Sequence, residues 1–159
     1  MRILYDSKQL QYKTPFGTLT PGQECTLTIH IPSAVRTTGV ECIIQYEHGG
    51  HHRTVSIGFK KKKGPYDIFQ DSFCLEYPGL YFYYFYIHNP SGGFRLFKQG
   101  DDTNMEAGDL WQVSCVPADF TTPEWARGGI IYQVFPDRFH KAGKVNLEGK
   151  LEPYTVHRH

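Results

Sequence analysis

Apolar and polar residues alternate in short runs through residues 1–117. In the run 24–31, Cys25, Leu27, Ile29 and Ile31 alternate with Thr26, Thr28 and His30. Side chains of a strand point alternately to opposite faces, so the first set is predicted to enter a core. Seven such runs are separated by Gly, Pro and Asn turns and predict strands at 24–31, 40–46, 53–60, 66–77, 79–88, 94–97 and 111–116. This pattern predicts an all-β, immunoglobulin-like β-sandwich.

The run at residues 80–87 differs from the others, because it is aromatic or aliphatic on both faces. Tyr81, Tyr83 and Phe85 would share one face, and Phe82, Tyr84 and Tyr86 would share the other. A strand cannot turn both faces into the core of one sandwich. One tyrosine-bearing face must therefore meet a different environment, and the sequence does not say which one.

The alternation stops after residue 117, and the chain is predicted to have three parts. Residues 1–117 form the β-sandwich module, and residues 118–128 are a linker with a turn-prone composition. Residues 129–135 are a continuous apolar run, which suits a strand buried on both faces in a parallel sheet. Residues 129–159 are therefore expected to be the start of a second, truncated domain.

Composition narrows the classes of function. The chain has 159 residues, of which 40% are hydrophobic, 21% charged and 15% aromatic, as in a soluble globular protein rich in strands. The net charge of +1 gives no general attraction to nucleic acid or anionic lipid, so neither nucleic acid nor membrane is an expected partner. No run resembles a signal peptide or a membrane span, and we expect a cytoplasmic protein. The four cysteines, Cys25, Cys42, Cys74 and Cys115, are interpreted as buried apolar residues in preference to disulfides or metal ligands.

The segment around the apolar run carries a family resemblance. Trp125 and then Gly-Ile-Ile-Tyr-Gln-Val-Phe-Pro-Asp-Arg-Phe at 129–139 resemble the first barrel strand of the α-amylase-type glycoside hydrolases, family 13. Many enzymes of that family carry an N-terminal immunoglobulin-like module related to carbohydrate-binding families 34 and 48. The run Gly-Leu-Tyr-Phe-Tyr-Tyr-Phe at 79–85 resembles the Gly-x-Tyr-x-Tyr strand of such modules, and residues 111–120 resemble the connection between the two domains.

The resemblance implies the N-terminal part of an enzyme that hydrolyses starch, maltodextrin, pullulan or cyclodextrin. Such enzymes have a (β/α)₈ barrel and follow a retaining path with two carboxyl groups, which lie after later barrel strands. No catalytic role is therefore assigned to this chain, and Asp137 is expected to be structural. No cofactor is implied. Some relatives bind calcium after the first strand, but Lys144 stands here where an oxygen ligand is needed, so no metal site is expected.

Sugar rings bind proteins by laying their apolar faces on aromatic planes. The candidate platforms for an α-glucan or maltooligosaccharide are Tyr81, Tyr83, Tyr84, Tyr86 and Trp111. Tyrosines on a sandwich strand are more often core or interdomain residues. The alternative is therefore a structural module without sugar binding, which walls the active cleft, contacts the catalytic barrel or mediates a homodimer.

Two further clusters are interpreted as solvated turns. His48, His51 and His52 flank a Gly-Gly pair, but no carboxylate or cysteine completes a metal site. Lys60–63 precede Gly64 and Pro65 and are expected to form a solvated loop.

Overall fold

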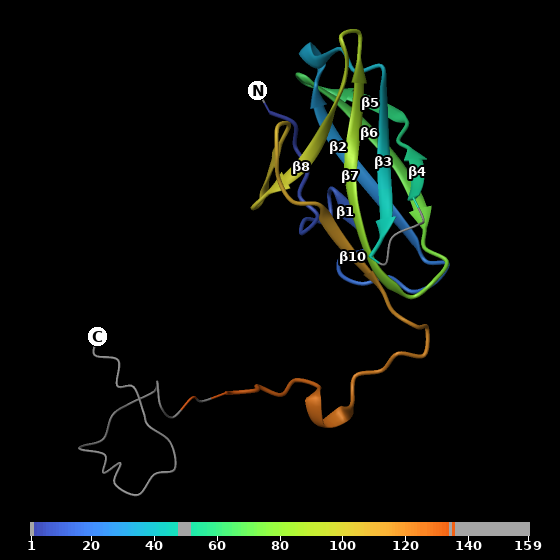
Figure 1. Ribbon diagram of the computed structural model, residues 1–159, viewed down its shortest axis with the longest axis vertical. Coiled ribbons are helices and arrows are strands. Elements are labelled where there is room, and N and C mark those ends of the chain that lie inside the picture. The colour runs from blue at the N-terminus through green and yellow to red at the C-terminus, as the bar shows by residue number, and fades with distance from the viewer. Residues whose placement is uncertain (1, 48–51, 134, 136–159) are drawn as a thin grey trace, which may run out of the picture. The chain divides into compact units, whose positions relative to one another are not determined.

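The computed structural model describes residues 2–47, 52–133 and 135. The chain divides into two units, Met1–Phe120 and Thr121–His159, and each is described by itself. In the described part of the first unit, two antiparallel sheets enclose one core (Figure 1). This architecture confirms the prediction of an all-β sandwich.

The smaller sheet has the strand order β1 (Lys13–Thr14), β2 (Glu24–Pro32), β6 (Tyr66–Cys74) and β5 (Phe59–Lys63). The larger sheet has the order β4 (His52–Ser56), β3 (Gly39–Tyr46), β7 (Gly79–Asn89), β8 (Gly92–Gln99) and β9 (Asp102–Asn104), with β10 (Trp111–Cys115) also paired to β7. A 3₁₀ turn, η1 (Ser33–Val35), follows β2. The prediction that one side of β2 enters the core is confirmed. Its four inward apolar side chains are fully buried: Cys25, Leu27, Ile29 and Ile31.

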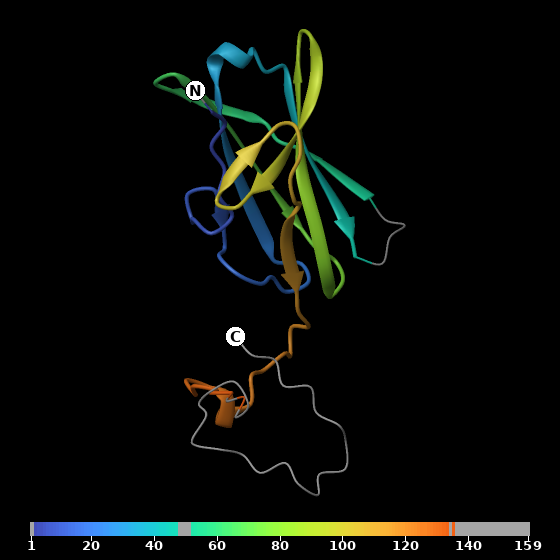
Figure 2. The same ribbon diagram turned by 60° about the vertical axis from the view of Figure 1, so that its left-hand side comes forward.

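Strand β7 lies in the middle of the larger sheet and is paired along both edges (Figure 1; Figure 2). One edge pairs with β3, whereas the other is shared by β10 beside residues 79–83 and by β8 beside residues 85–89. Tyr83, Phe85 and Ile87 are fully buried. Tyr84 and Tyr86 are half-buried on the opposite, outward face. The structure thus decides which tyrosine-bearing face leaves the core.

Four aromatic side chains form the centre of the core. Tyr5 packs edge-on against Phe85 and Trp111, with ring centroids 4.7 and 5.0 Å apart. Tyr83 and Trp111 are stacked at 6.0 Å and 24°. The hydroxyl groups of Tyr5 and Tyr83 lie 2.7 Å apart and share a hydrogen bond, which satisfies two phenols that water does not reach.

The N-terminal segment connects the two sheets, although its sequence predicted no such role. Leu4 exchanges backbone hydrogen bonds with His30 of β2, at 2.9 and 3.1 Å. The Thr103 hydroxyl of β9 donates to the Ile3 carbonyl at 2.8 Å, and Arg2 forms an ion pair with Asp102. Ile3 and Tyr5 are buried, so this segment closes the core along its own length.

The expected single strand at 53–60 and the expected loop at 60–63 are both wrong. The chain changes sheets at Ile57 and Gly58. The Ile57 amide donates to the Val40 carbonyl, and the Gly58 carbonyl accepts from Gln70, each at 2.8 Å. The lysines then belong to β5, an edge strand that pairs with β6 around a bulge between Phe59 and Lys61. An edge strand needs a partner on one side only, so exposed lysines fit it well.

In the second unit, the described residues contain one 3₁₀ turn, η2 (Glu124–Ala126). Ile130, Ile131, Tyr132 and Phe135 are exposed, and no strand includes the described residues between 129 and 135. The barrel strand at this position therefore stays a prediction. Among the described residues, no helix has the length and apolar character that a membrane crossing requires.

All four cysteines are free thiols, and Cys25, Cys42 and Cys115 are buried, as interpreted from the sequence. Cys74 is only partly buried. Burial in the core raises the pKa of the Cys42 thiol, which keeps it protonated at neutral pH. The three buried thiols, those of Cys25, Cys42 and Cys115, therefore act as small apolar residues.

Replacing Tyr83 by phenylalanine should destabilise the fold. Tyr83→Phe leaves the buried Tyr5 hydroxyl without its partner, at an expected cost of about 1–3 kcal/mol in the free energy of unfolding. Urea denaturation measures this cost. The control is Tyr84→Phe on the outward face of the same strand, which should change stability by less than about 0.5 kcal/mol. Equal effects of the two substitutions would contradict the assignment of the hydrogen bond.

The buried tyrosine pair should also make stability fall at alkaline pH. Burial, followed by the neighbouring Tyr83, raises the pKa of Tyr5 above its ordinary value of 10.0. Burial likewise raises the pKa of Tyr83. Because both pKa values are raised on folding, this stabilisation is complete below about pH 10 and is lost as the pH rises towards the folded-state values. Urea midpoints measured on both sides of pH 10 test this, and a constant midpoint would contradict it.

Candidate functional site

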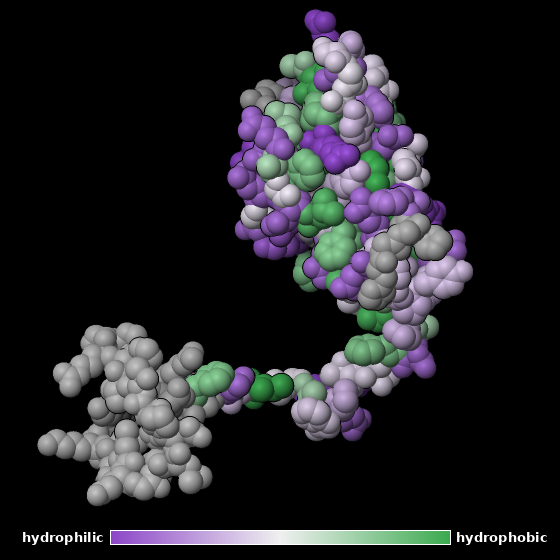
Figure 3. All heavy atoms as spheres, in the orientation of Figure 1, coloured by the Kyte–Doolittle hydropathy of each residue, from purple (hydrophilic) through white to green (hydrophobic). Residues whose placement is uncertain are grey.

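The outward side of the larger sheet carries a group of apolar and aromatic side chains. We call it the outer aromatic face and define it by five half-buried residues: Ile43 of β3, Phe82, Tyr84 and Tyr86 of β7, and Phe97 of β8. The strand register places Ile43 directly opposite Tyr84, and Arg95 of β8 opposite Tyr86. Figure 3, in the orientation of Figure 1, shows hydrophobic residues among polar ones on the surface of the module.

The outward side of the smaller sheet is different in character. There, Thr26 and Ser72 share a hydrogen bond of 2.9 Å across β2 and β6. Gln70 donates to the Thr28 hydroxyl at 2.7 Å. Hydrogen-bonded polar pairs are the usual covering of a solvated sheet face. The same sheet also carries Tyr12, His30 and Tyr66 in ring contact, at centroid distances of 5.1 and 6.3 Å, so its surface mixes polar pairs with one aromatic row.

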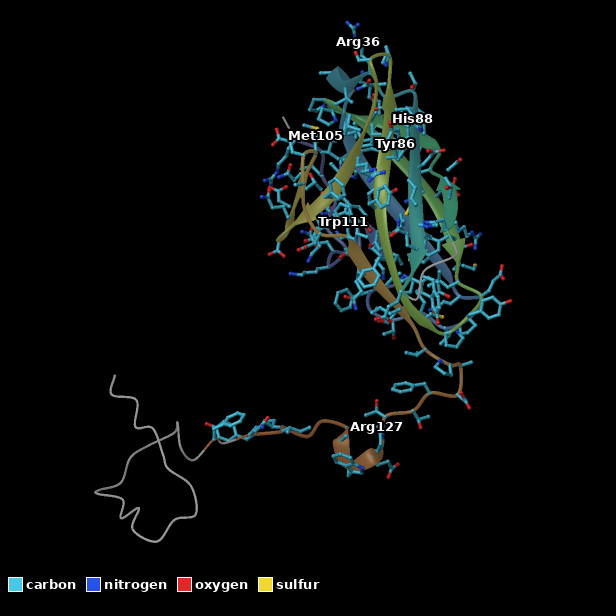
Figure 4. The ribbon with its side chains drawn as sticks, viewed as in Figure 1. Arg36, Tyr86, His88, Met105, Trp111 and Arg127 are labelled. Atoms are coloured by element: carbon cyan, nitrogen blue, oxygen red, sulfur yellow. The ribbon has the colours of Figure 1, made fainter. Side chains whose placement is uncertain are left out.

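Tyr86 lies against the backbone of the neighbouring strand. A β-carbon added to Gly93 of β8 would lie 2.6 Å from Tyr86 Cε1 and 2.9 Å from its hydroxyl. Because Gly93 has no side chain, the Tyr86 ring can pack directly against the backbone of β8. His88 packs against the Tyr86 ring at 4.8 Å and 62° (Figure 4). Gly93 belongs to β8 and His88 to β7, so two regular strands fix the position of the Tyr86 ring.

Tyr84 lies between two residues of β8. Its ring is nearly parallel to that of Phe97, at 24° and a centroid distance of 6.2 Å. The guanidinium carbon of Arg95 lies 5.3 Å from the centroid of the same ring, which is a cation–π contact. Arg95 is exposed, so its five N–H donors are also available to an incoming polar ligand.

Polar groups border the aromatic rings. His88 Nε2 lies 3.0 Å from a carboxylate oxygen of Glu41, on the strand next to β7. Gln45 of β3 and Gln112 of β10 are both opposite Phe82 in the register. The site thus combines flat apolar surface with hydrogen-bonding groups at its edges, an arrangement that suits a ligand with both apolar and hydroxyl-bearing surfaces.

The five platforms predicted from the sequence fall into three groups. Tyr84 and Tyr86 are together on the outer aromatic face. Tyr83 and Trp111 are a correction: they are 0% and 2% exposed, because they pack against Tyr5 and build the core, so a ligand does not reach their rings. Tyr81 is on the inward side of β7 at the end of the sandwich, where its hydroxyl donates to the Tyr77 carbonyl at 2.7 Å.

Sequence reasoning missed Arg95 and Phe97 as members of this site. Both lie in a strand that was predicted, but the prediction carried no register between that strand and β7. Within the described ranges, no three histidine, cysteine or acidic side chains come together as metal ligands do. His48, His51, Asp137 and the segment 137–146 lie outside the described residues.

Comparisons with known proteins agree with the family resemblance. An amylopullulanase of Thermoanaerobacterium saccharolyticum is 23% identical over 161 residues, covering 93% of this chain and 12% of the amylopullulanase. An amylopullulanase of Thermoanaerobacter thermohydrosulfuricus is 24% identical over 166 residues, covering 91% of this chain and 10% of the relative. The resemblance to the α-amylase-type glycoside hydrolases is confirmed. No protein-family model matches the chain.

The fold has a counterpart among solved structures. A cyclomaltodextrinase aligns with a TM-score of 0.52 and 18% identity, over 85% of this chain and 23% of that enzyme. At this identity the alignment supports the fold alone. The chain spans only a small part of each of these proteins, and their names describe whole enzymes.

Filling the space at Gly93 should displace Tyr86. In Gly93→Ala, the added methyl group would overlap the Tyr86 ring and the Ile87 carbonyl, at 2.6 and 2.9 Å. We expect a loss of about 1–3 kcal/mol in stability from overpacking, together with a changed chemical shift of the Tyr86 ring protons. Urea denaturation and NMR measure the two effects. Gly58→Ala is the control, since its nearest contact would be an ordinary 3.6 Å. Unchanged Tyr86 shifts in Gly93→Ala would contradict the contact.

Proposed function

We propose that this chain is the N-terminal part of an α-glucan-hydrolysing glycoside hydrolase. Its first unit is an immunoglobulin-like module of the carbohydrate-binding type, and residues 129–135 are the first strand of a (β/α)₈ barrel. The proposal is supported by the similarity to two amylopullulanases over more than nine-tenths of the chain. It is also supported by the sequence at 129–139. Cleavage of the glucosidic bond is assigned to the barrel, and no residue of this chain receives a catalytic role.

The module itself is proposed to bind α-glucan on the outer aromatic face. The observation that carries this proposal is that Tyr84 and Tyr86 point away from a core that is already complete without them. The apolar face of a glucose ring would lie on these rings. Its hydroxyl groups would meet Arg95, His88 and Glu41, which border the rings.

The spacing of the two tyrosines favours a chain over a single sugar. Alternate residues of a strand are about 6.6–6.8 Å apart, so Tyr84 and Tyr86 offer two neighbouring platforms. Phe97 extends the surface sideways from Tyr84. These side-by-side platforms on a sheet face are suited to the interior of a linear glucan.

A second role is favoured by the non-polar members of the same face. Ile43, Phe82 and Phe97 carry no hydrogen-bonding group, yet they are half-buried on the outward side. An apolar sheet face of this kind also suits a protein contact, with the catalytic barrel or with a second copy of the chain. In that role the face would be covered without sugar, and the module would wall the active cleft or support a dimer.

Affinity electrophoresis in starch-containing gels separates these two roles. The unmodified chain should be retarded, and Tyr84→Ala or Tyr86→Ala should weaken retardation. An aromatic contact contributes about 0.5–1.5 kcal/mol, so a loss of about two- to tenfold in affinity is expected for each. Tyr66→Ala is the matched control, because Tyr66 is a half-buried tyrosine of the smaller sheet.

The result that contradicts glucan binding is equally direct. If the unmodified chain migrates at the same rate with and without starch, the face does not bind glucan. Retardation that survives both tyrosine substitutions would place the sugar elsewhere on the module. Tyr84→Ala that changes the sedimentation coefficient instead of the retardation would favour the structural role.

A further inference from the structure

A pocket of about 420 Å³ lies at one end of the sandwich, apart from the outer aromatic face. It is formed by the end of β3, the start of β4, the segment that follows β6 and the first part of β7. Its lining includes three tyrosines, Tyr46, Tyr77 and Tyr81. Three charged or ionisable side chains, those of His52, Arg53 and Glu76, complete the polar part.

Two hydrogen bonds hold the pocket walls in place. Arg53 Nη1, from β4 of the larger sheet, donates to the Cys74 carbonyl of β6 in the smaller sheet at 2.7 Å. The Tyr81 hydroxyl donates to the Tyr77 carbonyl at 2.7 Å, which fixes the turn before β7. A cavity whose walls are already fastened loses little entropy when a ligand enters.

A glycine seats the first of the aromatic rings. Gly79 has φ of 154°, and a β-carbon there would lie 2.3 Å from Tyr46 Cε2. The Tyr46 ring therefore occupies the space that any other residue at position 79 would fill. Tyr81 lies beside it, with ring centroids 5.1 Å apart and planes at 54°. The two rings form a corner, which explains the Gly-x-Tyr spacing at residues 79–81.

Polar groups in the pocket remain available to a ligand. Among the described residues, neither the Glu76 carboxylate nor the His52 ring has a hydrogen-bond or ion-pair partner. Tyr77 is 70% exposed, although it is a large aromatic residue. Arg53 and Glu76 carry opposite charges that balance, so the pocket does not favour a charged ligand over a neutral one. The pocket therefore offers aromatic rings, hydrogen-bonding groups without a partner and balanced charges. These features match a small, neutral, polyhydroxylated ring compound.

We propose that this pocket binds the end of an α-glucan chain, one or two glucose units long. Its volume is at the lower end of the range for small-molecule sites, about 300–1,000 Å³, so it suits a chain end better than a long segment. This inference rests on the proposed glucan-binding function and adds a second site of different selectivity. The outer aromatic face would take the interior of a chain, and the pocket would take its terminus.

NMR titration of the whole chain with maltose and with maltoheptaose tests the proposal. Maltose should shift the signals of His52, Arg53, Tyr77 and Tyr81 in a saturable manner. Tyr77→Ala should weaken maltose binding about two- to tenfold, given about 0.5–1.5 kcal/mol for an aromatic contact. The same variant should leave the response of Tyr84 and Tyr86 to maltoheptaose unchanged. Glu76→Gln, a conservative change at an exposed position, keeps the test valid if Tyr77→Ala does not fold.

Two controls sharpen the result. Sorbitol has similar hydroxyl groups without a ring, so it should not shift the pocket signals. Tyr84→Ala should reduce maltoheptaose binding at the face and leave the maltose response of the pocket intact. Tyr77→Ala is thus expected to weaken binding at the pocket only, and Tyr84→Ala to weaken binding at the outer aromatic face only.

The outcomes distinguish this inference from the proposed function. Maltoheptaose that shifts the face while neither sugar shifts the pocket would overturn the inference and leave the proposed function standing. Maltose that shifts the pocket while no sugar shifts the face would overturn binding at the face only. If neither sugar shifts either set of signals, both proposals fail.

Discussion

The pairing of β7 along both edges is the constraint on which the rest of the module depends. With β3 on one side and β10 and β8 on the other, the strand cannot rotate or slip without breaking three ladders. A shift by one residue would exchange its two faces and send Tyr84 and Tyr86 inward. The hydrogen bond between Tyr5 and Tyr83 acts against such a shift, because only the native register brings the two hydroxyls together.

The sequence allowed the two faces of β7 to be recognised, but not to be told apart. Tyr83 and Tyr84 are the same residue type in adjacent positions, and their burial is decided by partners far away along the chain. Tyr5 is separated from Tyr83 by 78 residues, and Trp111 comes from a strand placed beside β7 by the fold. Local alternation carries no information about such contacts. It was sufficient for β2, where one face is plainly apolar and the other plainly polar.

Lysines 60–63 show a second limit of local reasoning. A run of like charges predicts solvent exposure, and these residues are indeed exposed. Exposure does not distinguish a loop from an edge strand, however, because the backbone of an edge strand is paired on one side only. The bulge at Phe59 and Lys61 is likewise set by pairing with β6, which sequence alternation does not report.

The lysine-rich strand has a consequence for how copies of this chain meet. A second β5 approaching the same edge in antiparallel fashion would bring lysine against lysine, and the repulsion would act before any hydrogen bond could form. Sheet growth by the addition of strands, the first step of fibril formation, is therefore opposed at this edge. Although one sheet face carries aromatic side chains, the free backbone groups of β5 are thus protected by charge from pairing with a second copy.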